Sequence, residues 1–322
     1  MPHFFEWQKG TIVEKHLAGK NAIVTGAGRG IGQAIALALA EQGVNIMIVD
    51  PGAAREGGSE DTRPASETAE MIRKLGVKAI AAYDSVADFK AAEAMVKRVV
   101  SEWGSLDILV NSAGVLREKM VFNMTEEDWD LVIAVHLKGT FNMSRHACAA
   151  MREQKSGRII NLTSDAWRVS VGQCNYAAAK GGIVSFTYDV AREMGRYGVT
   201  VNAIAPRAST RMTMTDKVRE GFRKRYESGV ITKEQLDDML NMPGPEGVSP
   251  IILWLCTEQA ANANGKVFHA EGGRISVYNE PEEVKSIYKR ADNGIFSLDE
   301  LLQVMPKTIA ATLVNPAPAQ KG

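Results

Sequence analysis

The chain alternates short apolar segments with longer segments of helical pattern. Residues Asn21–Ala27 ("NAIVTGA") and Val44–Asp50 ("VNIMIVD") are typical of buried strands, and between them "IGQAIALALAEQG" is typical of a helix that ends at Gly43. The alternation continues through "LDILVNSAG", "GRIINLTS" and "VTVNAIAP", each of which follows a helical stretch. Continuously apolar strands joined by helices indicate parallel strands buried on both faces of a sheet. The sequence therefore predicts an α/β fold with a doubly wound parallel sheet and right-handed crossovers.

Composition narrows the class of protein. The 322 residues are 45% apolar, which is enough for the core of one large α/β domain. Lys plus Arg and Asp plus Glu number 38 each, and this zero net charge does not favour nucleic acid or an anionic membrane as a partner. The N-terminus lacks the apolar segment of a signal peptide, and no stretch is apolar enough for a membrane helix. Three scattered cysteines (Cys148, Cys174 and Cys256) fit a reducing compartment. We expect a soluble, cytoplasmic protein without nucleic-acid, membrane or metal partners.

The alternating pattern covers residues 19–278, which we expect to form a single domain. Residues 1–18 form an N-terminal extension outside the pattern, and residues 279–322 form a charged C-terminal appendage with a loose tail. The appendage contains one amphipathic helix that begins at Ser297. Within the domain, residues 207–247 interrupt the alternation because they are polar, basic and helix-prone.

A glycine-rich turn, "TGAGRGIG" (Thr25–Gly32), joins the first strand to its helix. Glycines at positions 26, 28, 30 and 32 let the backbone approach a ligand without a Cβ clash. The following helix N-terminus offers free N–H groups and a partial positive charge to a pyrophosphate. A tight turn alone would also explain the glycines. The strand before, the helix after and an acid at the end of the second strand favour nucleotide binding.

That acid is Asp50, eighteen residues beyond Gly32. This spacing is typical of a carboxylate that accepts hydrogen bonds from both ribose hydroxyls of a dinucleotide. A carboxylate there repels a 2′-phosphate, so the sequence favours NAD over NADP. Arg55 lies nearby and could serve NADP instead.

Tyr176 and Lys180 are separated by one helical turn, so they share a helix face. A Tyr with an unperturbed pKa of about 10 is a poor base at neutral pH, and a neighbouring cation stabilises its phenolate. We expect Lys180 to lower the pKa of Tyr176 in this way. The phenol would then exchange a proton with an alcohol or ketone while hydride moves to or from the cofactor. A Tyr and a Lys on a helix are more often ordinary solvated residues, and the order of motifs along the chain favours the site.

The sequence resembles the short-chain dehydrogenase/reductase family. The resemblance rests on "TGAGRGIG", "NSAG" (Asn111–Gly114), the Tyr176–Lys180 pair with an upstream Ser, and "VTVNAIAP", in that order over residues 19 to 275. "AAYDSV", "EDWDLVIAVHLKGTF" and "GQCNYAAAKGGI" are similar in kind to 3-hydroxyacyl-CoA dehydrogenase domains of multifunctional enzymes and to bacterial hydroxysteroid dehydrogenases. The resemblance implies a Rossmann-like domain, a nicotinamide cofactor, and a homodimer or homotetramer.

The resemblance also implies roles for individual residues. The catalytic residues would be Ser164, Tyr176 and Lys180, with His136 as a further candidate. The cofactor-binding residues would be Gly26, Arg29, Gly30, Ile31, Asp50, Asp84, Ser85, Asn111, Ala113, Gly114, Tyr176, Lys180 and Pro206.

The identity of the catalytic hydroxyl is open between two neighbours. Counting back twelve residues from Tyr176, as is usual in the family, leads to Thr163, whereas aligning the strand "GRIIN" leads to Ser164. We favour Ser164 because strand register determines side-chain direction and loops absorb deletions. The shortened loop carries Trp167 and Arg168 in place of the usual glycine, which makes it a candidate for substrate preference.

Two other positions depart from the usual family pattern. His136 stands where most members have an Asn that supports a proton path, and it either relays protons or simply packs in its helix. Arg207 follows Pro206 where a Gly is usual, and its side chain would narrow the wall beside the nicotinamide. The resemblance implies that residues 207–247 form a substrate lid. The cations of its basic part, Arg207–Arg225, either meet coenzyme A phosphates or are solvated.

We therefore expect NAD-dependent oxidation of a secondary alcohol, or the reverse, on a 3-hydroxyacyl-CoA or steroid-like substrate. One alternative is an NADP-dependent ketone reductase. The other is a non-catalytic nucleotide sensor on the same scaffold, which the presence of both Tyr176 and Lys180 disfavours.

Overall fold

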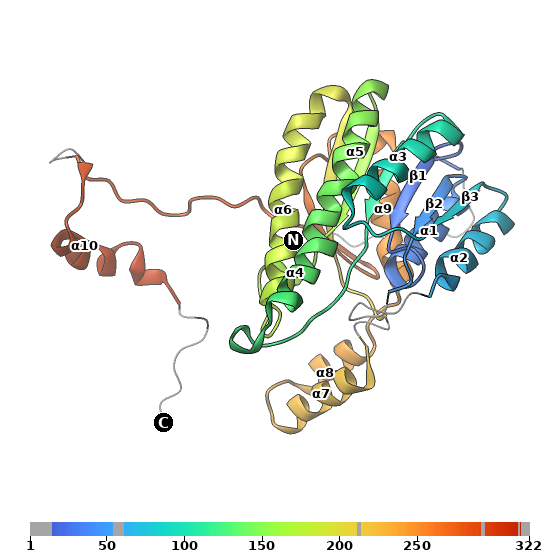
Figure 1. Ribbon diagram of the computed structural model, residues 1–322. Coiled ribbons are helices and arrows are strands. Elements are labelled where there is room, and N and C mark those ends of the chain that lie inside the picture. The colour runs from blue at the N-terminus through green and yellow to red at the C-terminus, as the bar shows by residue number, and fades with distance from the viewer. Residues whose placement is uncertain (1–14, 54–60, 211–213, 291–293, 315, 317–322) are drawn as a thin grey trace, which may run out of the picture. The chain divides into compact units, whose positions relative to one another are not determined.

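The computed structural model describes residues 15–53, 61–210, 214–290, 294–314 and 316 (Figure 1). Arg55, the residue considered for NADP, lies outside the described residues. The chain divides after Tyr278 into two compact units. The first contains the sheet, and the second, from Asn279, contains one α-helix among its described residues, α10 (Leu298–Val304), which Ser297 caps.

The described part of the first unit is built on one eight-stranded sheet in the order β3-β2-β1-β4-β5-β6-β7-β8. All neighbouring strands are parallel except β8, which pairs with β7 in antiparallel register. The strands are β1 (Asn21–Thr25), β2 (Asn45–Val49), β3 (Ala79–Ala82), β4 (Ile108–Asn111), β5 (Gly157–Leu162), β6 (Val199–Pro206), β7 (Val267–Glu271) and β8 (Arg274–Val277). The predicted doubly wound parallel sheet is confirmed, and the edge strand β8 was not expected.

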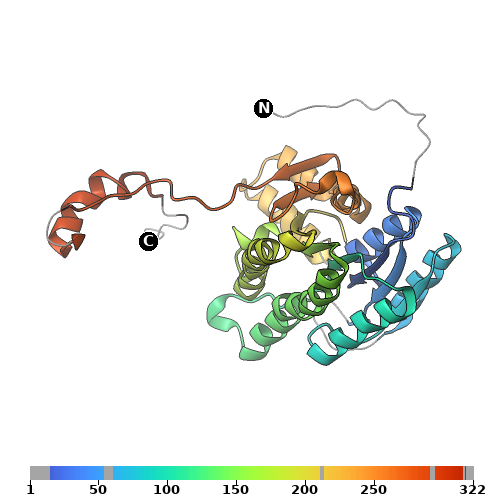
Figure 2. The same ribbon diagram turned by 90° about the horizontal axis from the view of Figure 1, so that it is seen from above.

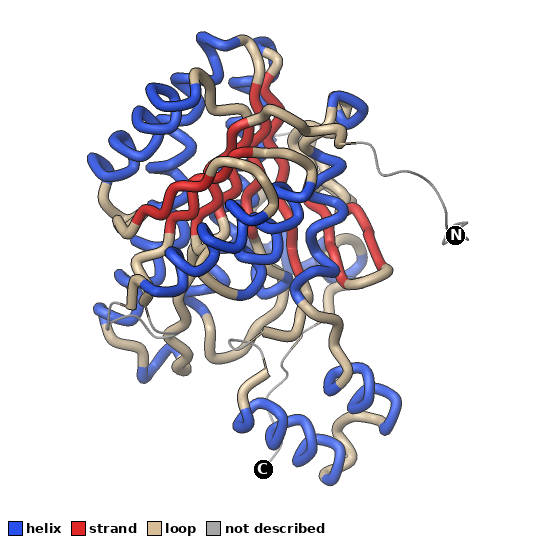
Figure 3. Tube along the Cα trace, turned by 90° about the vertical axis from the view of Figure 1, so that its right-hand side faces the viewer, coloured by secondary structure: helices blue, strands red, loops and turns tan. Residues whose placement is uncertain are grey.

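Helices cover both faces of the sheet (Figure 2; Figure 3). The helices α1 (Gly30–Glu41), α2 (Arg63–Lys74) and α9 (Ser249–Leu255) pack on one face, and α3 (Phe89–Trp103), α5 (Gly139–Gln154) and α6 (Cys174–Met194) pack on the other. Side chains of β1 alternate between these layers: Ala22 and Val24 face the first, and Ile23 faces the second. This burial on both faces explains why the strands are apolar throughout.

The long helix expected from Thr125 onward is interrupted. Thr125 begins it with a capping box closed by Asp128, as the first-turn acids suggested, and α4 covers Glu126–Ile133. A π-helical segment, Ala134–Lys138, then precedes α5. Such segments are rare and frequent at functional sites, and this one carries His136.

The polar segment between β6 and α9 forms two helices, α7 (Asp216–Glu227) and α8 (Lys233–Leu240). Figure 1 shows this pair, in gold, projecting from one end of the sheet. We call residues 207–247 the lid. None of the described helices is both long and apolar enough to span a lipid bilayer.

Thr25, at the end of β1, joins the two halves of the sheet. Its hydroxyl oxygen accepts hydrogen bonds from the backbone N–H groups of Ser112 and Ala113, at 3.0 and 3.1 Å. Thr25 is buried, and the two donor residues are half-buried. The hydroxyl thereby holds the turn after β4 against the glycine turn after β1.

We expect Thr25→Val to lower the free energy of unfolding by about 2 kcal/mol, because a side chain of the same shape leaves two half-buried N–H donors without their acceptor. Thr25→Ser keeps the oxygen and loses one methyl group, at a cost of about 1 kcal/mol. Urea unfolding of both variants tests this, and equal losses would contradict the role given to the hydroxyl.

Candidate active site

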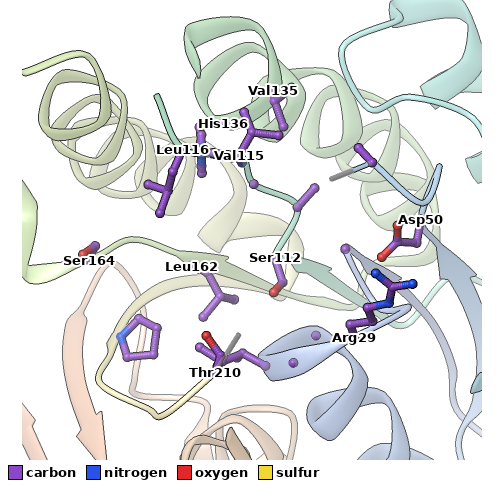
Figure 4. A pocket seen from close by; sticks show the side chains of 18 of the residues that line it. Arg29, Asp50, Ser112, Val115, Leu116, Val135, His136, Leu162, Ser164 and Thr210 are labelled. Atoms are coloured by element: carbon purple, nitrogen blue, oxygen red, sulfur yellow. Dashed lines mark hydrogen bonds between the residues drawn. The ribbon is translucent and has the colours of Figure 1, made fainter. Parts of the chain in front are cut away.

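A cavity of about 460 Å³ lies at the carboxyl ends of β1, β2, β4, β5 and β6. Ligands bind at this edge of doubly wound sheets because the strand order reverses there. Figure 4 shows Arg29 and Asp50 at one end of the cavity and Ser164 at the other, with His136 above. The cavity is therefore elongated, with a nucleotide-type end and a hydroxyl-bearing end.

The glycine turn has almost no room for side chains. Gly26 has φ +64°, and a Cβ built on it would lie 2.8 Å from Cα of Ala113. The helix α1 begins at Gly30, and its N-cap residue Arg29 makes no side-chain capping hydrogen bond. The first N–H groups of α1 are thus left to the cavity, where an anionic group would meet them.

The carboxylate of Asp50 is held by the backbone. Its Oδ2 accepts from the N–H of Gly28 at 2.9 Å, and its Oδ1 accepts from the N–H of Gly52 at 2.8 Å. A Cβ on Gly28 would lie 2.7 Å from Oδ2, so only glycine permits this contact. The Arg29 guanidinium lies 3.2 Å from the Asp61 carboxylate and is partly exposed.

Tyr176 and Lys180 lie on the first turns of α6, and both line the cavity. The Nζ atom of Lys180 lies 5.5 Å from the centroid of the Tyr176 ring and donates to the carbonyl oxygen of Leu162. Burial lowers the pKa of Lys180 to about 7.

Burial also raises the pKa of Tyr176; a hydrogen bond from Ser164 lowers that pKa and the charge of Glu118 raises it, both less strongly than burial. We expected the ammonium of Lys180 to lower this pKa, and that expectation was wrong for the chain alone. The reason is that burial removes hydration from the phenolate, and the nearby hydrogen bonds and charges do not compensate for that loss.

The two candidate hydroxyls have different partners. Thr163 is buried, and its hydroxyl donates to the carbonyl oxygen of Lys180 at 2.8 Å. The Ser164 hydroxyl accepts from the N–H of Ala166 at 3.3 Å and hydrogen-bonds the Tyr176 phenol. Thr163 therefore supports the helix that carries the Tyr–Lys pair, whereas the Ser164 hydroxyl faces the phenol.

His136 is packed beneath Tyr176. The two rings meet edge to face with centroids 5.1 Å apart, and Nε2 of His136 lies 2.8 Å from the carbonyl oxygen of Val115. Among the described residues, Nδ1 has no hydrogen-bond partner. Burial lowers the pKa of His136 to about 3, with a smaller contribution from the charge of Lys180. The ring is thus neutral at physiological pH.

Most of the residues expected at the site line one cavity. They are Gly26, Arg29, Gly30, Ile31, Asp50, Ser85, Ala113, Gly114, His136, Ser164, Tyr176, Lys180 and Pro206. Asp84 is exposed beside Ser85 and does not line it. Asn111 is buried behind it, where its amide nitrogen donates to Ser144 and Asn161 at 3.0 and 2.9 Å.

The sequence interpretation did not select three residues that matter here. Thr25 opens the glycine motif, and that position was the available signal. Ser112 and Thr210 line the cavity, and Figure 4 shows both between its two ends. Thr210 belongs to the lid, where nothing in the sequence pattern distinguishes it.

Residues 20–221 match the profile of the short chain dehydrogenases. The chain belongs to the short-chain dehydrogenase/reductase family. Its members are NAD(P)-dependent oxidoreductases that act on CH–OH groups and the corresponding ketones, and the predicted membership and enzyme class are confirmed.

Relatives within the family have several names. Hydroxyacyl-CoA dehydrogenase ChsB1 of Mycobacterium tuberculosis is 38% identical over 274 residues, which are 82% of this chain and 81% of that protein. The reductase FabG of Staphylococcus aureus, which acts on 3-oxoacyl-[acyl-carrier-protein], is 37% identical over 79% of this chain and 97% of its own length. The peroxisomal multifunctional enzyme type 2 of mouse is 38% identical over 80% of this chain, which matches 32% of that longer enzyme.

A solved structure of a short chain dehydrogenase from Mycobacterium avium superposes with a TM-score of 0.76 at 39% identity, and the match covers 95% of this chain and all of that one. The fold of the family is therefore shared over nearly the whole length.

The neutral state of His136 makes stability pH-dependent. In the unfolded chain the imidazole takes up a proton near pH 6.5, but in the folded chain it does so only near pH 3. The unfolded state therefore binds more protons between these values, and stability falls as pH falls through that window. Between pH 7 and pH 5 we expect the wild type to lose about 2 kcal/mol more than His136→Asn. Urea unfolding at both pH values tests this; equal losses would mean that His136 is hydrated.

Proposed function

We propose that the protein is an NAD-dependent dehydrogenase that oxidises a secondary alcohol, or reduces the corresponding ketone, on a 3-hydroxyacyl-CoA or steroid-like molecule. One observation carries the proposal: a single cavity joins a backbone-held carboxylate, Asp50, to a phenol that contacts a hydroxyl and a lysine. The glycine turn fits a dinucleotide, since side chains there would meet backbone.

The proposed chemistry divides the work among three side chains. Bound NAD supplies the acceptor for hydride. Ser164 orients the substrate oxygen, and Tyr176 exchanges the proton at that oxygen. The raised pKa of Tyr176 keeps the phenol protonated, which is the form that gives a proton to a ketone. Oxidation requires the phenolate. Because Lys180 does not lower the pKa of Tyr176 in the chain alone, we propose that the cationic nicotinamide of NAD, when bound, would favour the phenolate together with protonated Lys180.

His136 and Thr163 support this arrangement without exchanging protons. A ring that is neutral and packed edge-on against Tyr176 restricts the phenol to one orientation. The Thr163 hydroxyl holds α6 in place by donating a hydrogen bond to the Lys180 carbonyl oxygen. We therefore propose Ser164, not Thr163, as the catalytic hydroxyl.

The preference for NAD rests on Asp50. Two backbone N–H groups hold its carboxylate at the end of β2, where a 2′-phosphate would be repelled. The alternative cofactor, NADP, would need a cation in the same place. Arg55, the residue considered from the sequence, lies outside the described residues; among the described residues Arg29 is a candidate, and it pairs with Asp61. The FabG relative favours ketone reduction as the runner-up activity.

Apolar side chains support an acyl or steroid substrate. Leu116, Leu131, Leu162 and Met242 line the cavity, and the relatives include a hydroxyacyl-CoA dehydrogenase. We further propose a homodimer or homotetramer in the cytoplasm, as expected from the family resemblance. Light scattering on purified protein tests the assembly.

We expect Tyr176→Phe to lower kcat/KM at least about 100-fold, because the ring stays and the exchangeable proton is lost. The assay is NAD reduction with 3-hydroxyacyl-CoA thioesters and hydroxysteroids. If the wild type turns over no member of this panel, the substrate class is refuted, and NAD binding without any alcohol oxidation would favour the nucleotide sensor.

In the same assay, Ser164→Ala should lose far more activity than Thr163→Val; the reverse order would make Thr163 the catalytic hydroxyl.

We expect the wild type to bind NADH more tightly than NADPH, and Asp50→Ala to weaken NADH binding about tenfold, the size of a hydrogen bond to a charged group. The same change should weaken NADPH binding less or improve it, because a like charge is removed. Calorimetric titration of both cofactors measures this. Tighter NADPH binding by the wild type would overturn the cofactor preference.

A further inference from the structure

His269 on β7 lies between two carboxylates outside the cavity. Its Nδ1 is 3.2 Å from Oδ2 of Asp165, and its Nε2 is 3.4 Å from Oε2 of Glu271. The His269 residue is only 6% exposed. Side chains two apart on a strand share a face, which explains the pairing with Glu271, whereas Asp165 comes from the loop after β5.

Asp165 immediately follows Ser164 and has a second donor. The Tyr278 hydroxyl, just after β8, donates to Oδ1 of Asp165. The Tyr278 ring is in turn covered by the Arg168 guanidinium at 5.1 Å and by the edge of Trp167 at 5.9 Å. We call residues 165–168 the Ser164 loop. These contacts connect the loop to Tyr278, which follows the edge strand β8.

Glu271, the other partner of His269, is connected to the lid through Arg207. The Arg207 guanidinium donates to Oε1 of Glu271 through Nη1 and to Oδ2 of Asp238, on α8, through Nη2 at 2.9 Å. Arg207 was expected to narrow the wall of the cavity. It lines the cavity, but its charge is turned to these two carboxylates.

His269 thus connects two segments that flank the same cavity. The two ring nitrogens of His269 each lie within contact distance of one carboxylate, Nδ1 beside Asp165 and Nε2 beside Glu271. Without this ring, Asp165 would keep its Tyr278 donor and Glu271 its Arg207 donor, but the side chain that joins the two carboxylates would be lost. The titratable and charged groups that face one another here are Asp165, Arg168, Arg207, Asp238, His269, Glu271 and Tyr278.

We propose that His269 is a positioning residue: by bridging Asp165 and Glu271 it couples the Ser164 loop to lid helix α8, so that Ser164 takes its working position only when the lid is anchored. The proposal rests on the proposed function in one respect, which is that Ser164 orients the substrate.

The ring can be replaced one donor at a time. His269→Asn keeps an N–H donor near the position of Nδ1, toward Asp165, and His269→Gln keeps one near Nε2, toward Glu271. His269→Phe keeps a planar ring and removes both nitrogens. We expect His269→Phe to lower kcat roughly tenfold, the effect of one hydrogen bond to a charged group, with the KM for NAD unchanged. The Asn variant should recover kcat, and the Gln variant should recover the KM for substrate.

A buried histidine elsewhere provides the matched control. His146, on α5, packs against Phe89 with ring centroids 4.4 Å apart and ring planes tilted by 58°, and it lies outside the cavity. His146→Phe should leave kcat and both KM values unchanged. A rise in the KM for NAD in parallel with the fall in kcat of His269→Phe would indicate a general loss of structure and would overturn the proposal. If His269→Phe does not fold, Tyr278→Phe removes one donor to Asp165 and should lower kcat in the same way.

Hydrogen exchange on the full chain tests the coupling without any substrate. In His269→Phe we expect faster exchange both in the Ser164 loop and in α8 (Lys233–Leu240), and in Asp238→Asn we expect faster exchange in the Ser164 loop as well. Faster exchange confined to β7 would overturn the coupling. A wild type without turnover would defeat the proposed function, while the exchange result would still decide whether His269 couples loop and lid.

Discussion

The parallel pairing of β1 with β4 is the constraint on which the rest of the structure depends. It brings together the carboxyl ends of two strands at the point where the strand order reverses: β2 and β3 follow on the β1 side, and β5 to β8 follow on the β4 side. The glycine turn after β1 then touches the turn after β4, and the Thr25 hydroxyl holds both turns. The cavity opens at this junction because the crossover helices leave it in opposite directions.

Desolvation controls the chemistry within the cavity. Lys180 and His136 are buried and Tyr176 is half-buried, and burial is the first cause of the pKa shift of each group. Each shift favours the neutral form. Backbone carbonyls and N–H groups hold the polar atoms, as Leu162 does for Lys180 and Val115 does for His136. The site is therefore organised by the main chain before any ligand arrives.

Local sequence patterns predicted the positions of most helices and strands, but they did not predict irregular segments or the burial of site residues. The apolar runs located the parallel strands, and Thr125 and Ser297 were recognised as helix starts because caps act over three residues. The π-helical segment at His136 and the edge strand β8 were not predicted, since neither changes the residue pattern. The direction of the pKa shift of Tyr176 was wrong because a spacing of four residues specifies proximity to Lys180 and says nothing of burial.

The sequence by itself determined the α/β alternation, the glycine turn with Asp50, and the common helix face of Tyr176 and Lys180, because each depends on residues close together in the chain. Only the tertiary structure decided that Thr163 turns to the Lys180 carbonyl while Ser164 turns to the phenol. It also placed Tyr278 against Asp165, more than one hundred residues away, with His269 beside them. The physical reason is that hydrogen-bond partners and burial are set by which strands become neighbours, and no local periodicity contains that information.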